Sequence, residues 1–155
     1  MRGAPLPAGR RRAVSVAILA ALAAGCAGSA APPGAAPALR DTYWALLEID
    51  GNTFLEYRGT REPHVVFRSE GTRVTGFSGC NNMAGMYEAT GASLHIRPLA
   101  LTRMACTEAE SAVMESALLR ALDQTESYRI SGTTLELRDA AGAPRVRLEA
   151  RGTPR

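Results

Sequence analysis

Lysine is absent from this chain of 155 residues, and all 18 of its basic side chains are arginine. We attribute this bias, which accompanies abundant alanine, to a genome rich in G and C rather than to phosphate binding. After residue 25 no apolar run reaches 18 residues, so that part of the sequence has no candidate membrane-spanning helix. No serine stands in a nucleophile-elbow context, and no β-α-β alternation is visible. A nucleophilic serine and a parallel sheet are therefore not expected.

The N-terminus carries the pattern of an export signal. Three arginines at residues 10–12 precede an apolar stretch at residues 13–24, and small residues lead up to Cys26. The stretch is about a dozen residues long, whereas a membrane-spanning helix needs roughly 20. The segment resembles a bacterial lipoprotein lipobox, with Ala23 at the position where leucine is usual. We therefore predict a lipoprotein-type signal peptide at residues 1–25 and lipidation of Cys26. The alternative is a soluble exported protein cut between Ala24 and Ala31.

Removal of the signal peptide changes the charge of the chain. Four of the 18 arginines lie in residues 1–25, so the mature chain carries 14 basic against 15 acidic residues. The basic pI of the precursor, about 9.1, belongs to the targeting segment. A nearly neutral mature chain gives no support to nucleic-acid binding, and we expect no nucleic-acid partner.

The cysteine count is odd, with Cys26, Cys80 and Cys106 as the three thiols. An odd count in an exported protein raises the question of where the remaining thiol goes. Acylation of Cys26 would leave Cys80 and Cys106 to pair in an oxidising compartment, where disulfides persist. This bridge would close a loop of about 25 residues, which contributes on the order of 3 kcal/mol in the chain-entropy model.

The rest of the chain reads as a tether followed by one domain. Residues 26–39 consist almost entirely of alanine, proline, glycine and other small residues, and we expect a flexible tether there. Residues 40–150 alternate short apolar runs with turn signals, which predicts an antiparallel meander of seven or eight short strands. The predicted strands lie at residues 42–49, 64–68, 72–78, 85–89, 93–96, 127–130, 134–138 and 145–150. Trp44, the one tryptophan, is expected to anchor the core, and the glycines of residues 72–78 predict a bulge or a close backbone approach.

One helix interrupts the strands, and the fold class is therefore α+β. Thr107 and Glu110 fit a capping box at its start, and an apolar stripe runs to about Gln124. The predicted stripe comprises Val113, Met114, Ala117, Leu118, Ala121 and Leu122. Glu115 is assigned to the opposite, polar face, and the stripe is expected to lie against the sheet.

Several ordered motifs resemble one protein family. They are Gly79-Cys80-Asn81 followed by Gly85 and Tyr87, the run from Leu101 to Cys106 before the helix, and the closing SYRI and LEL segments. Across roughly residues 41–149 the sequence is similar to the META domain family, which includes HslJ-like heat-shock lipoproteins of the bacterial envelope. The resemblance implies an α+β fold in which antiparallel strands curl around one helix. It also implies an envelope location, often as a lipoprotein, and a part in stress or antibiotic tolerance; it brings no established enzymatic activity.

Three polar residues near the predicted disulfide are candidates for binding. Asn81 and Asn82 follow Cys80 and offer amide donors and acceptors, although we favour a structural role, because asparagine tolerates positive φ and satisfies turn backbone groups. Arg103 could place its guanidinium beside the asparagine pair. It is the first residue to mutate in a test of binding. We nevertheless favour a structural role for Arg103, in which an ion pair fixes the loop.

Two rival types of site use the same region. A cysteine nucleophile with His64 or His95 as base would make an enzyme, but a paired cysteine is more simply a disulfide, and His95 is expected to be a solvated strand residue. A soft-metal site for copper(I) would use thiolates and thioethers, but a disulfide removes the thiolates and methionine is a common core filler. The residues in question are Cys80, Met83, Met86, Met104 and Cys106.

The function predicted from the sequence is a membrane-tethered, non-catalytic domain of the cell envelope that acts in stress or antibiotic tolerance through binding. We expect no cofactor and no metal. The membrane is contacted through the lipid, and the partner is an unidentified envelope protein or small molecule. In a cell with two membranes, Ala27 after Cys26 is compatible with an outer-membrane location facing the periplasm. The alternative is a periplasmic module that binds a small molecule or a soft metal such as copper.

Overall fold

The strands form a closed antiparallel barrel. A computed structural model describes residues 1, 3, 36–54, 59 and 61–152, and within these it contains eight strands that follow one another round the barrel in chain order. The signal peptide and Cys26 lie outside the described residues. The strands are β1 (Tyr43–Ile49), β2 (His64–Phe67), β3 (Arg73–Phe77), β4 (Asn82–Thr90), β5 (Ser93–Leu101), β6 (Ser127–Ser131), β7 (Thr134–Arg138) and β8 (Pro144–Arg151). A short 3-10 helix, η1 (Glu70–Thr72), precedes β3.

The α+β class and the antiparallel arrangement are confirmed, and closure is the detail that differs from a curled sheet. The first and last strands pair from Tyr43 opposite Arg151 to Ile49 opposite Val146. This contact joins the two ends of the domain, so every strand has a neighbour on both sides. Closure removes the free strand edges that an open sheet would expose to other chains.

The hairpin of β4 and β5 is longer than predicted, because β4 begins at Asn82 and β5 continues past Pro98 to Leu101. Pairing runs from Thr90 opposite Ser93 to Met83 opposite Leu101. Where the register shifts, Gly85 is paired with Leu99 and Met86 with Arg97, so the backbone of Pro98 is skipped. Proline lacks the N–H that a ladder needs and is tolerated at such bulges.

The N-terminal end of the domain is tied into the core by Trp44. Its side chain is fully buried, as predicted, and its indole Nε1 donates to the Leu39 carbonyl oxygen at 3.0 Å. Leu39 itself is 7% exposed and belongs to the main core cluster, and Thr42 donates to the Ala38 carbonyl oxygen at 2.6 Å. Ordered packing therefore begins by Ala38, within the stretch predicted as tether.

The single described α-helix, α1 (Ala109–Asp123), starts later than predicted. The capping box is wrong: Glu108 is the N-cap, in an extended conformation, and no side chain caps the helix. Cys106 is held by its disulfide two residues before this N-cap. The disulfide constrains the chain just before the helix, and a local capping pattern carries no information about such a contact.

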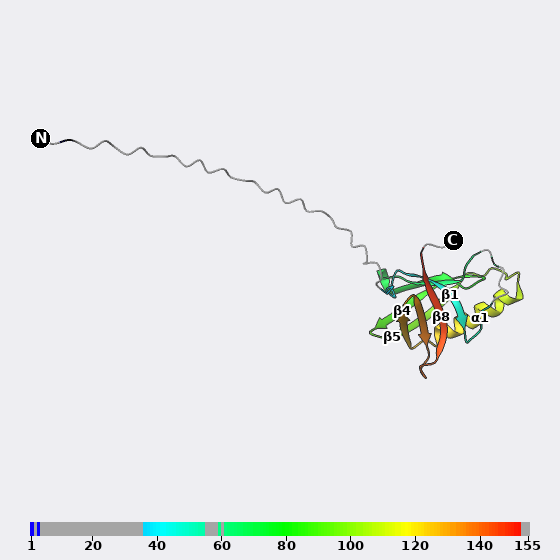
Figure 1. Ribbon diagram of the computed structural model, residues 1–155. Helices are drawn as coiled ribbons and strands as arrows, with labels where there is room; N and C mark the ends of the chain where they lie inside the picture. Colours follow the sequence, from blue (N-terminus) through cyan, green and yellow to red (C-terminus); the bar gives the residue numbers. More distant parts are fainter. Residues whose placement is uncertain (2, 4–35, 55–58, 60, 153–155) are drawn as a thin grey trace. The chain divides into compact units, whose positions relative to one another are not determined.

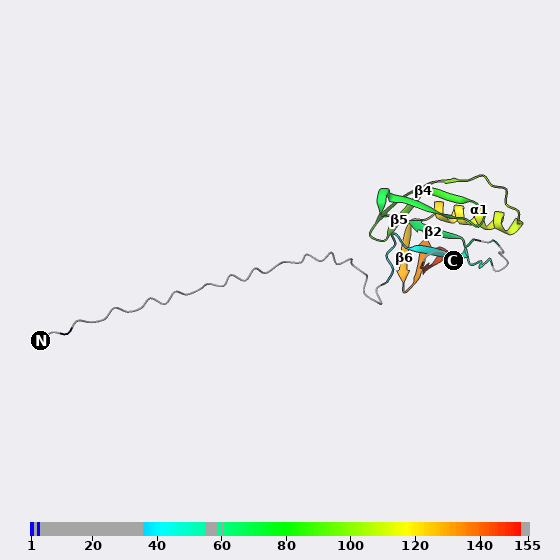
Figure 2. The same ribbon diagram turned by 90° about the horizontal axis from the view of Figure 1, so that it is seen from above.

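The buried face of α1 contains the predicted stripe except at Val113, because Ala117 also packs against the core and the face extends to Ser111. Met114, Leu118, Ala121 and Leu122 are buried, whereas Val113 is 62% exposed. The helix packs against β5 and against β1 and β8, an arrangement that can be followed in Figure 1 and Figure 2. Its apolar residues complete the core that the inward faces of the strands begin. In the described part of the chain, no helix is both long and apolar enough to cross a membrane.

The close backbone approach predicted for residues 72–78 is present at Gly76. A methyl group at this position would clash with the carbonyl oxygen of His64 on β2 and would lie 2.5 Å from Met83 Cε on β4. We expect Gly76→Ala to lower the free energy of unfolding by about 2 kcal/mol, because overpacking moves neighbouring backbone. Chemical denaturation measures this loss. Gly152→Ala is the control, because no described atom lies within 4 Å of its Cβ position; equal effects of the two changes would contradict the prediction.

Candidate functional site

The disulfide predicted from the cysteine count is present. Cys80, in the turn between β3 and β4, is bonded to Cys106, in the segment that leads into α1, with the two Cα atoms 5.5 Å apart. The bridge joins parts of the chain 26 residues apart. It therefore anchors both ends of the region in which the candidate binding residues lie.

Asn81 links this turn to the helix. The side chain is 4% exposed, and its Nδ2 donates to Glu115 Oε1 on α1 at 3.1 Å. The backbone N–H of Asn81 donates to the second carboxylate oxygen of Glu115 at 3.0 Å, and the Ser78 hydroxyl donates to the same oxygen. The Glu115 carboxylate is thus the acceptor that the turn is built around.

The same asparagine also holds the loop before the helix. Asn81 Oδ1 accepts hydrogen bonds from the backbone N–H of Met104 and from the Thr102 hydroxyl, both at 2.8 Å. Its Nδ2 lies 3.4 Å from the Met104 carbonyl oxygen. One buried amide therefore fastens the turn, the loop and the helix to one another.

The structural role favoured for Asn81 has a different physical basis from the one predicted. The residue that adopts positive φ in this turn is Gly79, with φ of 100°, and neither asparagine does so. Asn81 is suited to the position because an amide can donate to a carboxylate and accept from the backbone at the same time. A buried amide with all of these partners satisfied is a strong local constraint.

Glu115 was missed by the sequence analysis, which placed it on the polar face of the helix. It is half-buried and lies one residue after the buried Met114 and three before the buried Leu118. The buried Ser111 lies one turn before it. The available signal was a carboxylate that borders the apolar stripe directly after Met114, and its charge alone led to its assignment to the polar face.

Asn82 and Arg103 lie at the surface beside this core of contacts. Asn82 Oδ1 accepts a hydrogen bond from Arg61 Nη1 at 2.6 Å, and the Arg61 guanidinium lies 4.4 Å from the centre of the Phe77 ring. The guanidinium next to the asparagine pair is therefore that of Arg61 rather than Arg103. Arg103 is exposed, and no hydrogen bond or ion pair joins it to the residues that the structure describes. No motif or spacing in the sequence predicts that Arg61 contacts Asn82.

The proposed set of soft-metal ligands does not assemble as one group. Met83 is 2% exposed and part of the core, while Met86 is 45% exposed and Met104 is 64% exposed. Both sulfurs of Cys80 and Cys106 are in the disulfide. A different set lies close together, since the two sulfurs and a carboxylate oxygen of Glu115 are within 4.8 Å of one another.

The two histidines lie on strands with local partners. His64 is 9% exposed, stacks on Tyr43 with ring centres 4.4 Å apart, and has Nδ1 3.0 Å from the Glu62 carbonyl oxygen. Burial lowers the pKa of His64, and the hydrogen bond to Glu62 opposes this effect. His95 Nδ1 lies 3.1 Å from Glu126 Oε2, and the His95 side chain is 40% exposed. The cysteine and histidine residues of the disfavoured catalytic alternative therefore have other partners.

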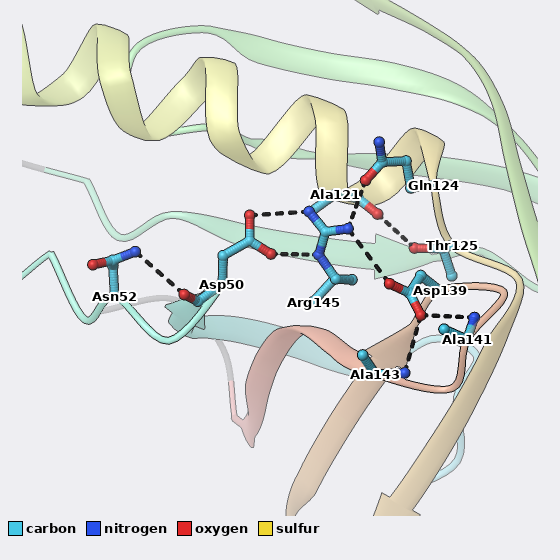
Figure 3. Close-up of polar contacts among 9 residues, drawn as sticks. All are labelled: Asp50, Asn52, Ala121, Gln124, Thr125, Asp139, Ala141, Ala143 and Arg145. Atoms are coloured by element: carbon cyan, nitrogen blue, oxygen red, sulfur yellow. Dashed lines mark hydrogen bonds and ion pairs between the residues drawn. The ribbon is translucent and has the colours of Figure 1, made fainter.

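A second polar cluster surrounds Arg145 at the start of β8 (Figure 3). Its guanidinium donates through Nε to Asp50 Oδ1 at 2.5 Å and through Nη2 to Asp50 Oδ2 at 3.2 Å. Nη1 lies 2.8 Å from Gln124 Oε1 and 3.5 Å from Asp139 Oδ2. The hydrogen bond from Arg145 lowers the pKa of Asp50. Because the guanidinium is occupied on both sides, this cluster joins the β1 turn, the end of α1 and the β7–β8 loop.

Comparison with known proteins agrees with the architecture. The META domain family model matches residues 37–152. An NMR structure of a protein from Burkholderia xenovorans is similar, with a TM-score of 0.55 and 26% sequence identity, over 74% of this chain and 85% of that chain. A second NMR structure, at 20% identity, has a TM-score of 0.57 over 72% of this chain and 91% of its own. No curated protein sequence matches the chain significantly.

Proposed function

Because the chain belongs to the META domain family, we propose that it is an HslJ-like, non-catalytic domain of the cell envelope that acts in stress or antibiotic tolerance by binding a protein partner. A lipid on Cys26 would hold the domain at a membrane. This position would leave the barrel free to meet its partner at the surface of the membrane. The proposal has two parts, a location and a binding surface.

The observation that carries the proposal is the disulfide between Cys80 and Cys106. Disulfides persist in oxidising compartments outside the cytosol, where secreted and envelope proteins fold. A bridge at this position supports export of the domain. It also accounts for two of the three thiols in the sequence, which leaves Cys26 for acylation.

The binding surface we propose is the loop at residues 102–107. Its side chains Arg103 and Met104 are exposed, Met104 by 64%. Its backbone is fixed by Asn81 at Met104 and by the disulfide at Cys106. A loop that is already ordered loses little conformational entropy on binding. Arginine and methionine are also enriched at the centres of protein interfaces.

Location is tested by mass spectrometry of the mature chain. We expect a mature protein that begins at Cys26 with a diacylglyceryl modification. The matched variant is Cys26→Ser, which should be released from the membrane fraction. A mature wild-type chain with a free Cys26, or one cut after Cys26, would show that the tether is wrong.

Binding is tested by capture of partners on the tethered mature protein under envelope stress. We expect one specific protein partner, and Arg103→Glu combined with Met104→Ala should weaken its binding by about tenfold or more, as for central interface residues. Arg73→Glu is the control because Arg73 is also exposed but lies on β3. Equal capture of the partner by the wild type, the double loop variant and the Arg73→Glu control would exclude the loop as the interface. Stabilisation of the domain by a small molecule instead would favour the binding-module alternative.

A further inference from the structure

Three potential metal ligands meet where the disulfide approaches α1. The sulfurs of Cys80 and Cys106 and one carboxylate oxygen of Glu115 all lie within 4.8 Å of one another, and each residue is partly buried. Zinc binds thiolate sulfur at about 2.3 Å and carboxylate oxygen at about 2.0–2.2 Å, so its ligands in a tetrahedral site lie about 3.5 Å apart. Three atoms this close can reach one ion with small side-chain movements once the sulfur–sulfur bond is broken.

The surroundings of these atoms resemble the outer shell of a metal site. Asn81 Nδ2 lies 3.3 Å from Cys80 Sγ and 3.1 Å from Glu115 Oε1. The other carboxylate oxygen accepts from Ser78 and from the Asn81 backbone. A carboxylate has about four acceptor positions, and these three donors leave one for a metal. Donors placed in this way orient a ligand, and an N–H directed at sulfur favours the thiolate.

We propose that the reduced form of this site, with Cys80, Cys106 and Glu115 as ligands, binds a zinc ion. Two thiolates and a carboxylate suit zinc, whereas copper(I) prefers sulfur ligands alone. The fourth position is taken by water. The site exists only while the cysteines are thiols, so metal binding and the disulfide are alternative states of the same residues.

The redox step between these states is a two-electron exchange. A dithiol reductant breaks the bond between the two sulfurs, supplies two electrons and two protons, and is itself oxidised to a disulfide. Cys80 and Cys106 then carry thiols, and zinc binding releases both protons as the thiolates form. The same thiol state precedes formation of the disulfide in the newly exported chain. This inference is independent of the partner-binding function proposed above.

Cobalt(II) titration of the full chain with Cys26→Ser tests the site, because Cys80 and Cys106 are then its only cysteines. After reduction with a phosphine we expect one equivalent of cobalt to give a thiolate-to-metal charge-transfer band, which zinc abolishes by displacement. The oxidised protein should give no band. X-ray absorption of the zinc-loaded reduced protein should show two sulfur ligands. Absence of the band after reduction, or fewer than two sulfurs, would overturn the proposal.

The contribution of Glu115 is measured with a matched pair on the same helix. In the reduced protein, Glu115→Gln should weaken cobalt binding by about tenfold or more, since even outer-shell changes cost this much. Glu110→Gln, which removes a carboxylate outside the three-ligand group, should leave the affinity unchanged. Equal affinities for the two variants would show that the carboxylate is not a ligand. The sulfur count of the wild-type site remains decisive if the Glu115 variant unfolds on reduction.

Discussion

Asn81→Asp should destabilise the domain by about 3–5 kcal/mol at neutral pH, the cost of leaving a buried charge uncompensated. The substitution conserves shape but replaces the amide that donates to Glu115 with a second carboxylate. It also leaves the Met104 carbonyl oxygen and Cys80 sulfur without their Asn81 donor. Urea denaturation at neutral pH measures the loss.

The effect should shrink in acid. The neighbouring Glu115 carboxylate raises the pKa of the introduced carboxyl in the folded state above its unfolded value of about 3.9. A group whose folded-state pKa is raised stabilises the fold in its protonated form, so this contribution is present at low pH and is lost as the pH rises through the folded-state pKa. The difference in stability between the variant and the wild type should therefore be smaller at about pH 4 than at pH 7.

The neighbouring residue provides the control for this prediction. Asn82→Asp makes the same chemical change one position along the chain, at an exposed residue whose side-chain oxygen already accepts from Arg61. A carboxylate beside a guanidinium at the surface changes stability by roughly 0–1 kcal/mol in the favourable direction. If both substitutions cost the same, or if the cost at position 81 does not depend on pH, the contact between Asn81 and Glu115 does not hold the turn.

The sequence predicted those parts of the fold that local patterns encode. Short apolar runs separated by turn signals located the strands, and the glycines in residues 72–78 indicated the close approach at Gly76. The odd number of cysteines predicted the bridge between Cys80 and Cys106. Each of these inferences depends on residue type and spacing within one segment, or on a count.

The parts that were not predicted depend on contacts between distant segments. Closure of the barrel requires Tyr43 to lie opposite Arg151, and neither strand carries a mark of its partner. The helix start at Ala109 follows a residue fixed by a disulfide, and Glu115 acquires its role from a turn that lies more than 30 residues away. Among the candidate binding residues, the sequence found Asn81 and Asn82 but paired them with Arg103, because Arg61 approaches from another part of the chain.

Removal of the disulfide should cost about 3 kcal/mol, the chain entropy that a loop of this length returns to the unfolded state. In the variant with Cys80→Ala and Cys106→Ala we expect the melting temperature to fall by about 10 °C for a domain of this size. Reduction of the wild-type protein should cause a similar fall and should not affect the variant. Calorimetry with and without reductant makes this comparison. Cys26→Ser should melt like wild type, because Cys26 is not part of the bridge.

The loop at residues 102–107 should respond to the same change. Without the bridge it keeps the hydrogen bonds of Asn81 to Met104 but loses its covalent anchor at Cys106. Local opening then exposes the bond after Arg103 to trypsin, since cleavage follows the population of the open form. We expect cleavage after Arg103 to be faster in the double cysteine variant than in the wild type, at a temperature where both are folded. Equal cleavage rates would mean that Asn81 alone orders the loop, and the disulfide would then act on the stability of the whole domain without fixing the proposed binding surface.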